Sequence, residues 1–137
     1  MTAEMPADTR AWLERAQDNR RWAEYNLSGG FISQACFACQ QAAEMMLKAL
    51  LLSHNAVPPK THDLVGLADI CAQSEPSVDA FEDAARMLTQ YYVATRYLDL
   101  PEAKRDYTKE EAVEALEHVD RLIGALRPII EERLQER

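Results

Sequence analysis

The sequence contains little glycine, few aromatic residues and no long apolar run. Only four of its 137 residues are glycine, and aromatic residues make up 7%. β-Branched residues rarely follow one another, so the chain offers little material for a β-sheet. The longest apolar stretch, 45–52, contains Lys48 and is far shorter than the roughly 20 residues that a membrane-spanning helix needs. These absences predict an all-α protein with no membrane association.

Positive charge is also scarce. Lys and Arg number 15 against 23 Asp and Glu, which gives a net charge of −8. An extended nucleic-acid surface needs a dense Lys/Arg face, so we expect none here. The first eight residues include acids and a proline and lack the pattern of an export signal, and the odd number of three cysteines is typical of reduced thiols. We therefore expect a cytoplasmic protein.

The chain length is typical of one domain, which we expect to span 1–137 with its core at 9–131. A chain of this size buries enough apolar surface to fold without a disulfide or a metal ion. Helical spacing of apolar residues dominates the sequence, and no internal repeat or linker interrupts it. The predicted fold is an antiparallel up-and-down helical bundle of about five helices, four long and one short.

Two long helices are predicted in the first half of the chain. Apolar residues recur at helical spacing over 9–28, with Asp8 and Thr9 as cap residues. Over 31–54 they cover more than half of the helix circumference, which is typical of a central helix. Pro58 and Pro59 exclude a helix from the segment that follows.

A short helix is expected next. Thr61 is predicted to cap it, with His62 and Asp63 in its first turn and its end near Gln73.

The second half of the chain predicts two further helices. The first covers about 78–97 and leads into an exposed loop at 98–107, a length that is often functional. Thr108 and Glu111 form the sequence pattern of a capping box, which opens the last helix. Pro128 is expected to kink that helix.

Several familiar catalytic and metal-binding patterns are missing. Cys36 and Cys39 lie on one helix face and would supply half of a zinc site, but no second pair of ligands accompanies them. We therefore interpret them as small core residues. No Glu-x-x-His of a di-iron site, no Gly-rich phosphate loop and no nucleophile elbow occurs. We expect no metal ion and no cofactor.

Polar residues interrupt the most apolar helix. They lie at spacings that place three of them on one face, and comprise Gln40, Gln41, Glu44 and Lys48. Arg96 follows two tyrosines near the end of the next long helix, where it would reach Glu44 as a desolvated bidentate pair. Such a pair either ties two helices together or belongs to a binding site, and the sequence leaves both interpretations open.

His62 also has two interpretations. Its imidazole either caps neighbouring backbone or points into a cleft. Lys60 and the free amides at the start of the short helix would together suit an anionic group.

Three segments of the sequence resemble one known family. They are the run QQAAEMMLKAL at 40–50, the run THDL at 61–64, and Tyr92 followed by Thr95, Arg96 and Tyr97. Their order, spacing and helical placement are similar to those of the HEPN domain family over about 12–130. The resemblance implies a five-helix bundle, commonly a homodimer, often encoded beside a minimal nucleotidyltransferase with which it forms a complex. Many such pairs are described as toxin–antitoxin modules.

The resemblance has a further implication for activity. The family was proposed to bind nucleotides, and several of its branches are metal-independent ribonucleases that use an arginine followed after four to six residues by a histidine. No arginine here has a histidine at that spacing, since Pro101, Glu102 and Ala103 follow Arg96 at the corresponding positions. Two further positions differ from the pattern of the HEPN family. Met45 stands where a lysine is usual, and Leu98 stands where a proline is usual. We expect no ribonuclease activity of that kind.

Three functions remain open on the sequence. The leading hypothesis is a non-catalytic HEPN-type binding module, a homodimer that associates with a nucleotidyltransferase in a toxin–antitoxin-like pair and binds a nucleotide. The second is a metal-independent ribonuclease toxin with a rearranged site, in which His62 and Arg96 meet. The third is a purely structural helical adaptor. The nucleotide pocket of the leading hypothesis consists of Gln41, Glu44, Lys48, His62, Tyr92, Arg96 and Tyr97.

Overall fold

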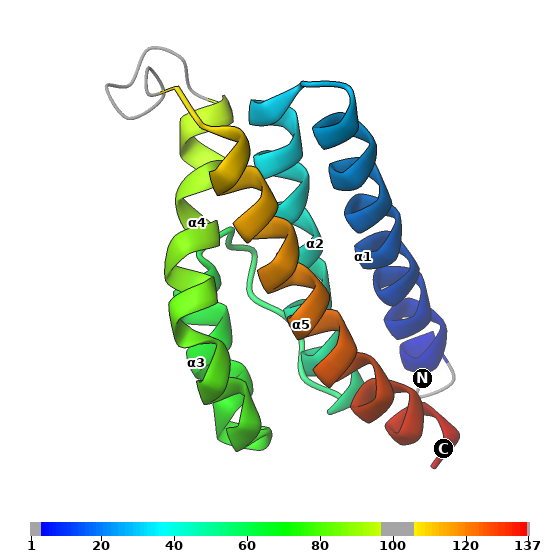
Figure 1. Ribbon diagram of the computed structural model, residues 1–137. Coiled ribbons are helices and arrows are strands. Elements are labelled where there is room, and N and C mark those ends of the chain that lie inside the picture. Colours follow the sequence, from blue (N-terminus) through cyan, green and yellow to red (C-terminus); the bar gives the residue numbers. More distant parts are fainter. Residues whose placement is uncertain (1–3, 97–105, 137) are drawn as a thin grey trace.

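The computed structural model describes residues 4–96 and 106–136 and consists of helices joined by turns (Figure 1). Within these residues no β-strand occurs, so the predicted all-α fold is confirmed. The elements in chain order are α1 (Glu4–Ser28), α2 (Ile32–Ser53), α3 (Leu64–Ser74), the 3₁₀-helix η1 (Pro76–Phe81), α4 (Glu82–Arg96) and α5 (Lys109–Gln135). Four long α-helices and one short one match the predicted bundle.

Helix α2 occupies the centre of the bundle, as its wide apolar arc predicts. It packs against α1, α3, α4 and α5, and sixteen of its 22 residues are buried. Many of them are alanine or cysteine, whose small side chains let neighbouring helices approach closely. In Figure 1, α5 crosses in front of α2, with α1 on one side and α4 on the other.

The turn between α1 and α2 depends on glycine. Gly30 has φ +85°, a left-handed conformation that a residue with a Cβ adopts at a cost. The backbone N–H of Phe31 donates to the Asn26 carbonyl at 2.8 Å, which closes the turn. Helices α1 and α2 therefore run antiparallel and side by side.

Helix α1 begins earlier than predicted. Asp8 and Thr9, the expected caps, both lie inside the helix, which starts at Glu4, and Thr9 is buried. Pro6 does not prevent this start, because the first turn of a helix leaves its N–H groups unbonded in any case.

Helix α4 begins later than predicted. The expected helix 78–97 opens instead as η1, with Pro76 at its first position, and α-helical geometry starts at Glu82. Arg96 is the last residue of α4 that the structure describes. Most of the predicted loop 98–107 lies outside the described residues.

Helix α5 begins as predicted. Thr108 Oγ1 accepts from the Glu111 N–H at 3.1 Å, and Glu111 Oε1 accepts from the Thr108 N–H at 3.1 Å, so the capping box is confirmed. Tyr107, just before it, packs edge-on against the buried Tyr91 with ring centroids 5.0 Å apart. Pro128 lies inside the helix, which continues to Gln135.

Polar contacts tie α5 to the rest of the bundle. Arg20 on α1 donates to Asp120 at 2.7 Å, and Arg133 donates to the Ser53 carbonyl at the end of α2 at 3.0 Å.

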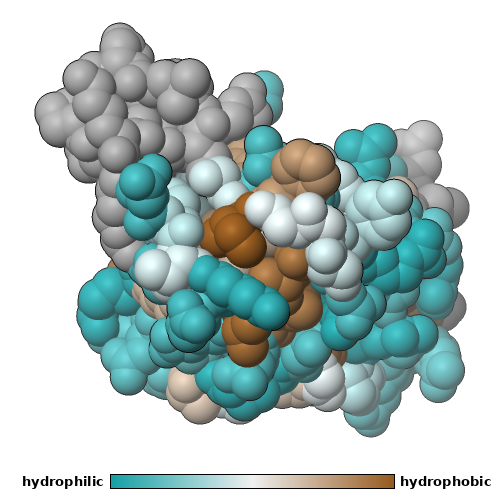
Figure 2. Space-filling model, turned by 45° about the horizontal axis from the view of Figure 1, so that its top comes forward, coloured by the Kyte–Doolittle hydropathy of each residue, from teal (hydrophilic) through white to brown (hydrophobic). Residues whose placement is uncertain are grey.

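Hydrophilic side chains cover most of the face in Figure 2, where a small apolar group lies among them. None of the helices in the described part of the chain is both long and apolar enough to cross a membrane.

Candidate functional site

The polar side chains that interrupt α2 meet the segment before α3. We call this group the polar centre, and it comprises Gln40, Gln41, Glu44, Lys48 and His62. The first four occupy successive turns of α2, where spacings of three and four residues bring side chains together. His62 approaches from the extended segment between α2 and α3, which Pro58 and Pro59 keep out of helical conformation.

Glu44 connects the members of the polar centre. Its Oε2 accepts from Lys48 Nζ at 3.0 Å, and its Oε1 accepts from Gln40 Nε2 at 3.2 Å and lies 2.9 Å from His62 Nδ1. Gln41 Nε2 extends the chain of contacts by donating to Gln40 Oε1 at 2.7 Å. The Glu44 and Lys48 side chains are only 6% and 8% exposed, so both charges are desolvated and each compensates the other.

His62 is the exposed end of this network. Its side chain is 49% exposed, although its partner Glu44 is buried. An ionised carboxylate only accepts hydrogen bonds, so His62 Nδ1 is the donor and Nε2 is left without the proton in the neutral ring. Glu44 thus fixes both the orientation and the tautomer of the imidazole.

Tyr92 completes the exposed edge. Its ring stacks on the His62 imidazole with centroids 3.8 Å apart and planes at 12°. Phe37 lies on α2 at 6.0 Å from the Tyr92 centroid. Helices α2 and α4 and the segment before α3 therefore all contribute to one aromatic surface beside the polar centre.

The start of α3 differs from the prediction. Asp63, not Thr61, is the N-cap, and its Oδ1 accepts from the Val65 N–H at 3.0 Å. Thr89 Oγ1 accepts from the Leu64 N–H at 3.0 Å. The backbone amides of Leu64 and Val65 are therefore already hydrogen-bonded. The expectation that free amides at this helix start bind an anion is wrong for these two residues. The reason is that a carboxylate one residue before the helix is a better cap than a hydroxyl three residues before it.

The structure brings five of the seven predicted pocket residues together. Glu44, Lys48, His62 and Tyr92 are joined by direct contacts, and Gln41 is joined to Glu44 through Gln40. The Arg96 side chain and all of Tyr97 lie outside the described residues, so the predicted pair of Glu44 with Arg96 stays a prediction. Glu44 has other partners in Lys48, Gln40 and His62.

The prediction missed two contributors to the site. Gln40 is outside the predicted pocket, although its amide donates to both Glu44 and the His62 carbonyl. Trp12 of α1 lies against the centre, with Lys48 Nζ 5.6 Å from its ring centroid. The sequence shows that Trp12 shares a helix face with core residues of α1. Nothing in the sequence indicates that Trp12 contacts Lys48.

The cysteines are core residues. Cys36, Cys39 and Cys71 are buried and form no disulfide. Burial raises the pKa of the Cys39 thiol well above its usual range and the pKa of the Cys71 thiol to about 12. In the described part of the chain, no three His, Cys, Asp or Glu side chains are grouped as a metal site requires.

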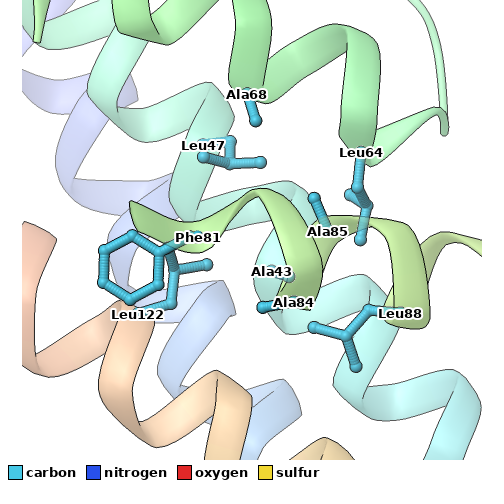
Figure 3. Close-up of a pocket in the computed structure, with 9 residues that line it drawn as sticks. All are labelled: Ala43, Leu47, Leu64, Ala68, Phe81, Ala84, Ala85, Leu88 and Leu122. Atoms are coloured by element: carbon cyan, nitrogen blue, oxygen red, sulfur yellow. The ribbon is translucent and has the colours of Figure 1, made fainter. Parts of the chain in front are cut away.

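An apolar gap between the helices is a poor candidate site. It lies where α2, α3, η1, α4 and α5 meet, and Figure 3 shows the alanine, leucine and phenylalanine side chains that line it. Its volume of about 10 Å³ is at the lower limit for a single water molecule, and its lining offers a water no polar partner. We interpret it as a packing defect.

The fold and the polar centre define a small helical-bundle domain whose central helix holds a desolvated polar network with one exposed edge. The model of the HEPN domain family matches residues 9–129, and the chain belongs to that family.

Two solved structures are similar to the chain. TT1696 from Thermus thermophilus is 34% identical with a TM-score of 0.77, and the match covers 91% of this chain and 97% of that one. ST0689, described as an archaeal HEPN homologue, is 27% identical with a TM-score of 0.70, covering 89% of this chain and 97% of the other. No functionally curated protein matches the chain significantly.

Proposed function

We propose that this HEPN domain is a non-catalytic binding module that holds a nucleotide at the exposed edge of its polar centre. The observation that supports this most directly is the His62 imidazole, which is half exposed, held by the buried Glu44 at 2.9 Å and stacked on Tyr92 at 3.8 Å. A stacked aromatic surface offers a face to a nucleobase, and an oriented imidazole offers a hydrogen-bonding nitrogen to a polar ligand group.

The buried members of the centre have a supporting role in this proposal. Glu44 and Lys48 are too buried to meet a ligand directly, and their mutual bond of 3.0 Å leaves little net charge. They hold His62 in place, while Gln41, which is partly exposed, adds an amide to the edge. Arg96 and Tyr97 are included on the sequence resemblance, as a phosphate contact and a further aromatic ring.

We further propose that the domain acts as a homodimer and associates with a separately encoded minimal nucleotidyltransferase in a toxin–antitoxin-like pair. Membership of the HEPN family supports both expectations, because the resemblance implies them. Co-purification of a tagged chain with a co-expressed nucleotidyltransferase from the same genome tests the association. Recovery of the tagged chain alone, at stringency low enough to keep the homodimer, would contradict it.

Calorimetry tests the nucleotide pocket. We expect saturable binding of ATP or GTP at submillimolar to millimolar concentration, and about tenfold weaker binding for His62→Ala and for Tyr92→Leu, because each removes part of the stacked edge. His118→Ala on α5 and Tyr25→Leu on α1 are matched controls away from the centre and should bind normally. Absence of heat at millimolar nucleotide in the unmodified protein refutes the pocket.

A second candidate, a metal-independent ribonuclease with a rearranged site, is favoured by one observation. A carboxylate bonded to Nδ1 of an exposed histidine is the arrangement that prepares Nε2 as a general base. Expression of the chain alone in bacteria separates the two functions. Growth arrest that His62→Ala or Arg96→Ala abolishes would favour the ribonuclease, and harmless expression would favour the binding module.

The structural adaptor is the remaining alternative. It predicts that Arg96→Met changes the melting temperature but neither nucleotide binding nor bacterial growth. Loss of binding in Arg96→Met at unchanged melting temperature would exclude it.

A further inference from the structure

A second feature lies on the α1 side of α2, apart from the His62 edge. An open hollow of about 250 Å³ lies there, lined by Ala11, Trp12, Arg15 and Met45. We call it the Trp12 hollow. Its volume is slightly below the range of pockets that hold whole small ligands, so it suits one ring-sized group and its substituent.

The Trp12 ring is connected to the polar centre by short contacts. Its centroid lies 5.6 Å from Lys48 Nζ, which lies 3.0 Å from Glu44 Oε2, whose other oxygen lies 2.9 Å from His62 Nδ1. Lys48 is buried, so it holds the indole from the protein side. The Trp12 hollow and the His62 edge therefore flank the same buried pair.

Arg15 gives the hollow a positive charge. Among the side chains that the structure describes, at 8–92 and 106–136, no acid forms an ion pair with Arg15, and the same holds for Arg10, Arg121 and Arg133. Ala11 and Asn19, four residues to either side on α1, are uncharged, and the nearby Asp18 pairs with Arg21. An unpaired guanidinium on a chain of net charge −8 is suited to an anion from outside.

Met45 supplies the remaining wall. Its thioether is flexible and polarisable, which suits contact with the edge of an aromatic ring, and Asn19 Nδ2 lies 3.4 Å from its sulfur. A planar ring would therefore contact Trp12 and Met45 while an attached anionic group meets Arg15.

We propose that the Trp12 hollow is a second nucleotide-binding position, separate from the His62 edge, in which the base contacts Trp12 and Met45 and a phosphate pairs with Arg15. The identity of the ligand rests on the proposed function. In this proposal Trp12 and Arg15 recognise the nucleotide, a role that neither the sequence nor the family match gives them.

Tryptophan fluorescence of the full chain tests binding in the Trp12 hollow. Trp22→Phe removes the other tryptophan, so the emission of that variant reports on Trp12 alone. We expect ATP to quench this emission saturably, adenosine to do so more weakly and inorganic triphosphate to leave it nearly unchanged. Arg15→Gln in the same background should raise the Kd for ATP about tenfold. Arg10→Gln, an exposed arginine of α1 outside the hollow, is the matched control and should not change it.

The outcomes separate this inference from the proposed function. If calorimetry detects ATP binding that His62→Ala weakens, while Trp12 emission and Arg15→Gln show no effect, binding in the Trp12 hollow is refuted and the His62 pocket stands. If ATP quenches Trp12 and Arg15→Gln weakens it, while His62→Ala has no effect, binding in the Trp12 hollow stands and the His62 pocket is refuted. Absence of binding in both measurements refutes both. Far-UV circular dichroism confirms that each variant is folded.

Discussion

Glu44 and Lys48 form one buried ion pair, but replacing Glu44 should destabilise the protein more than replacing Lys48. Glu44→Leu leaves the Lys48 ammonium, 8% exposed, with the Trp12 ring as its described neighbour, and leaves the Gln40 amide without its carboxylate. Lys48→Met leaves the Glu44 carboxylate, but that group still accepts from Gln40 and His62. The first substitution should therefore cost more than the second.

The magnitudes follow from the number of bonds lost. Removing one partner of a buried ion pair costs about 3–5 kcal/mol, and a hydrogen bond to a charged group contributes about 1.5–3 kcal/mol. We expect about 4 kcal/mol for Glu44→Leu and about 2 kcal/mol for Lys48→Met. The double variant removes both charges, so it should cost about 2 kcal/mol less than the sum of the two single variants.

Urea denaturation of the four proteins measures this cycle. The pair of Glu82 and Arg86 is a matched control, because it has the same spacing of four residues and a contact of 2.6 Å but is 56% and 61% exposed. Its coupling should be below about 0.5 kcal/mol. If the cycle at Glu44 and Lys48 gives a coupling as small as this control, or if both single variants cost less than about 1 kcal/mol, the pair is not desolvated in solution and the reasoning fails.

Three further predictions concern local structure. Thr108→Ala should lower the free energy of unfolding by about 1 kcal/mol because it removes a cap, and equal urea midpoints for the two proteins would contradict the capping box. Gly30→Ala should cost about 1 kcal/mol in the same assay because of φ +85°, whereas Gly124→Ala, with open space at its Cβ inside α5, should be neutral or stabilising. The Cys71 thiol keeps its proton in the folded protein up to about pH 12 but loses it near pH 9 when unfolded, so its contribution to stability is fully present below pH 9 and falls between pH 9 and 12. A Cys71→Ser variant should show a smaller decrease across that window, and an equal decrease would contradict burial as the cause.

Most of the fold could be predicted because periodicity and capping are local. The wide apolar arc of α2 indicated its central position, and the Thr108 and Glu111 pattern located the start of α5 to the residue. The wrong predictions concern the ends of helices, where two neighbouring residues can each begin the helix. Asp63 displaced Thr61 as a cap, and Pro76 began a 3₁₀-helix where an α-helix was expected.

The candidate site was less predictable because its contacts join distant parts of the chain. Spacing alone placed Glu44 and Lys48 on one face of a helix, and this was correct. The contact of His62 with Glu44 and the approach of Trp12 to Lys48 depend on how three elements pack, which no local pattern encodes. Lys48, one turn away on the same helix, is an ion-pair partner of Glu44, and the predicted pair of Glu44 with Arg96 stays a prediction.

The place of α5 at the end of the described chain affects how the protein folds during synthesis. One side of α2 is covered by α5, and Arg133 reaches the Ser53 carbonyl across a separation of 80 residues. At about 5–20 residues per second, a ribosome needs roughly 4–16 s to add those residues. For that interval the most apolar helix of the protein has an uncovered side, so nascent chains truncated before α5 should be the form that aggregates or engages chaperones.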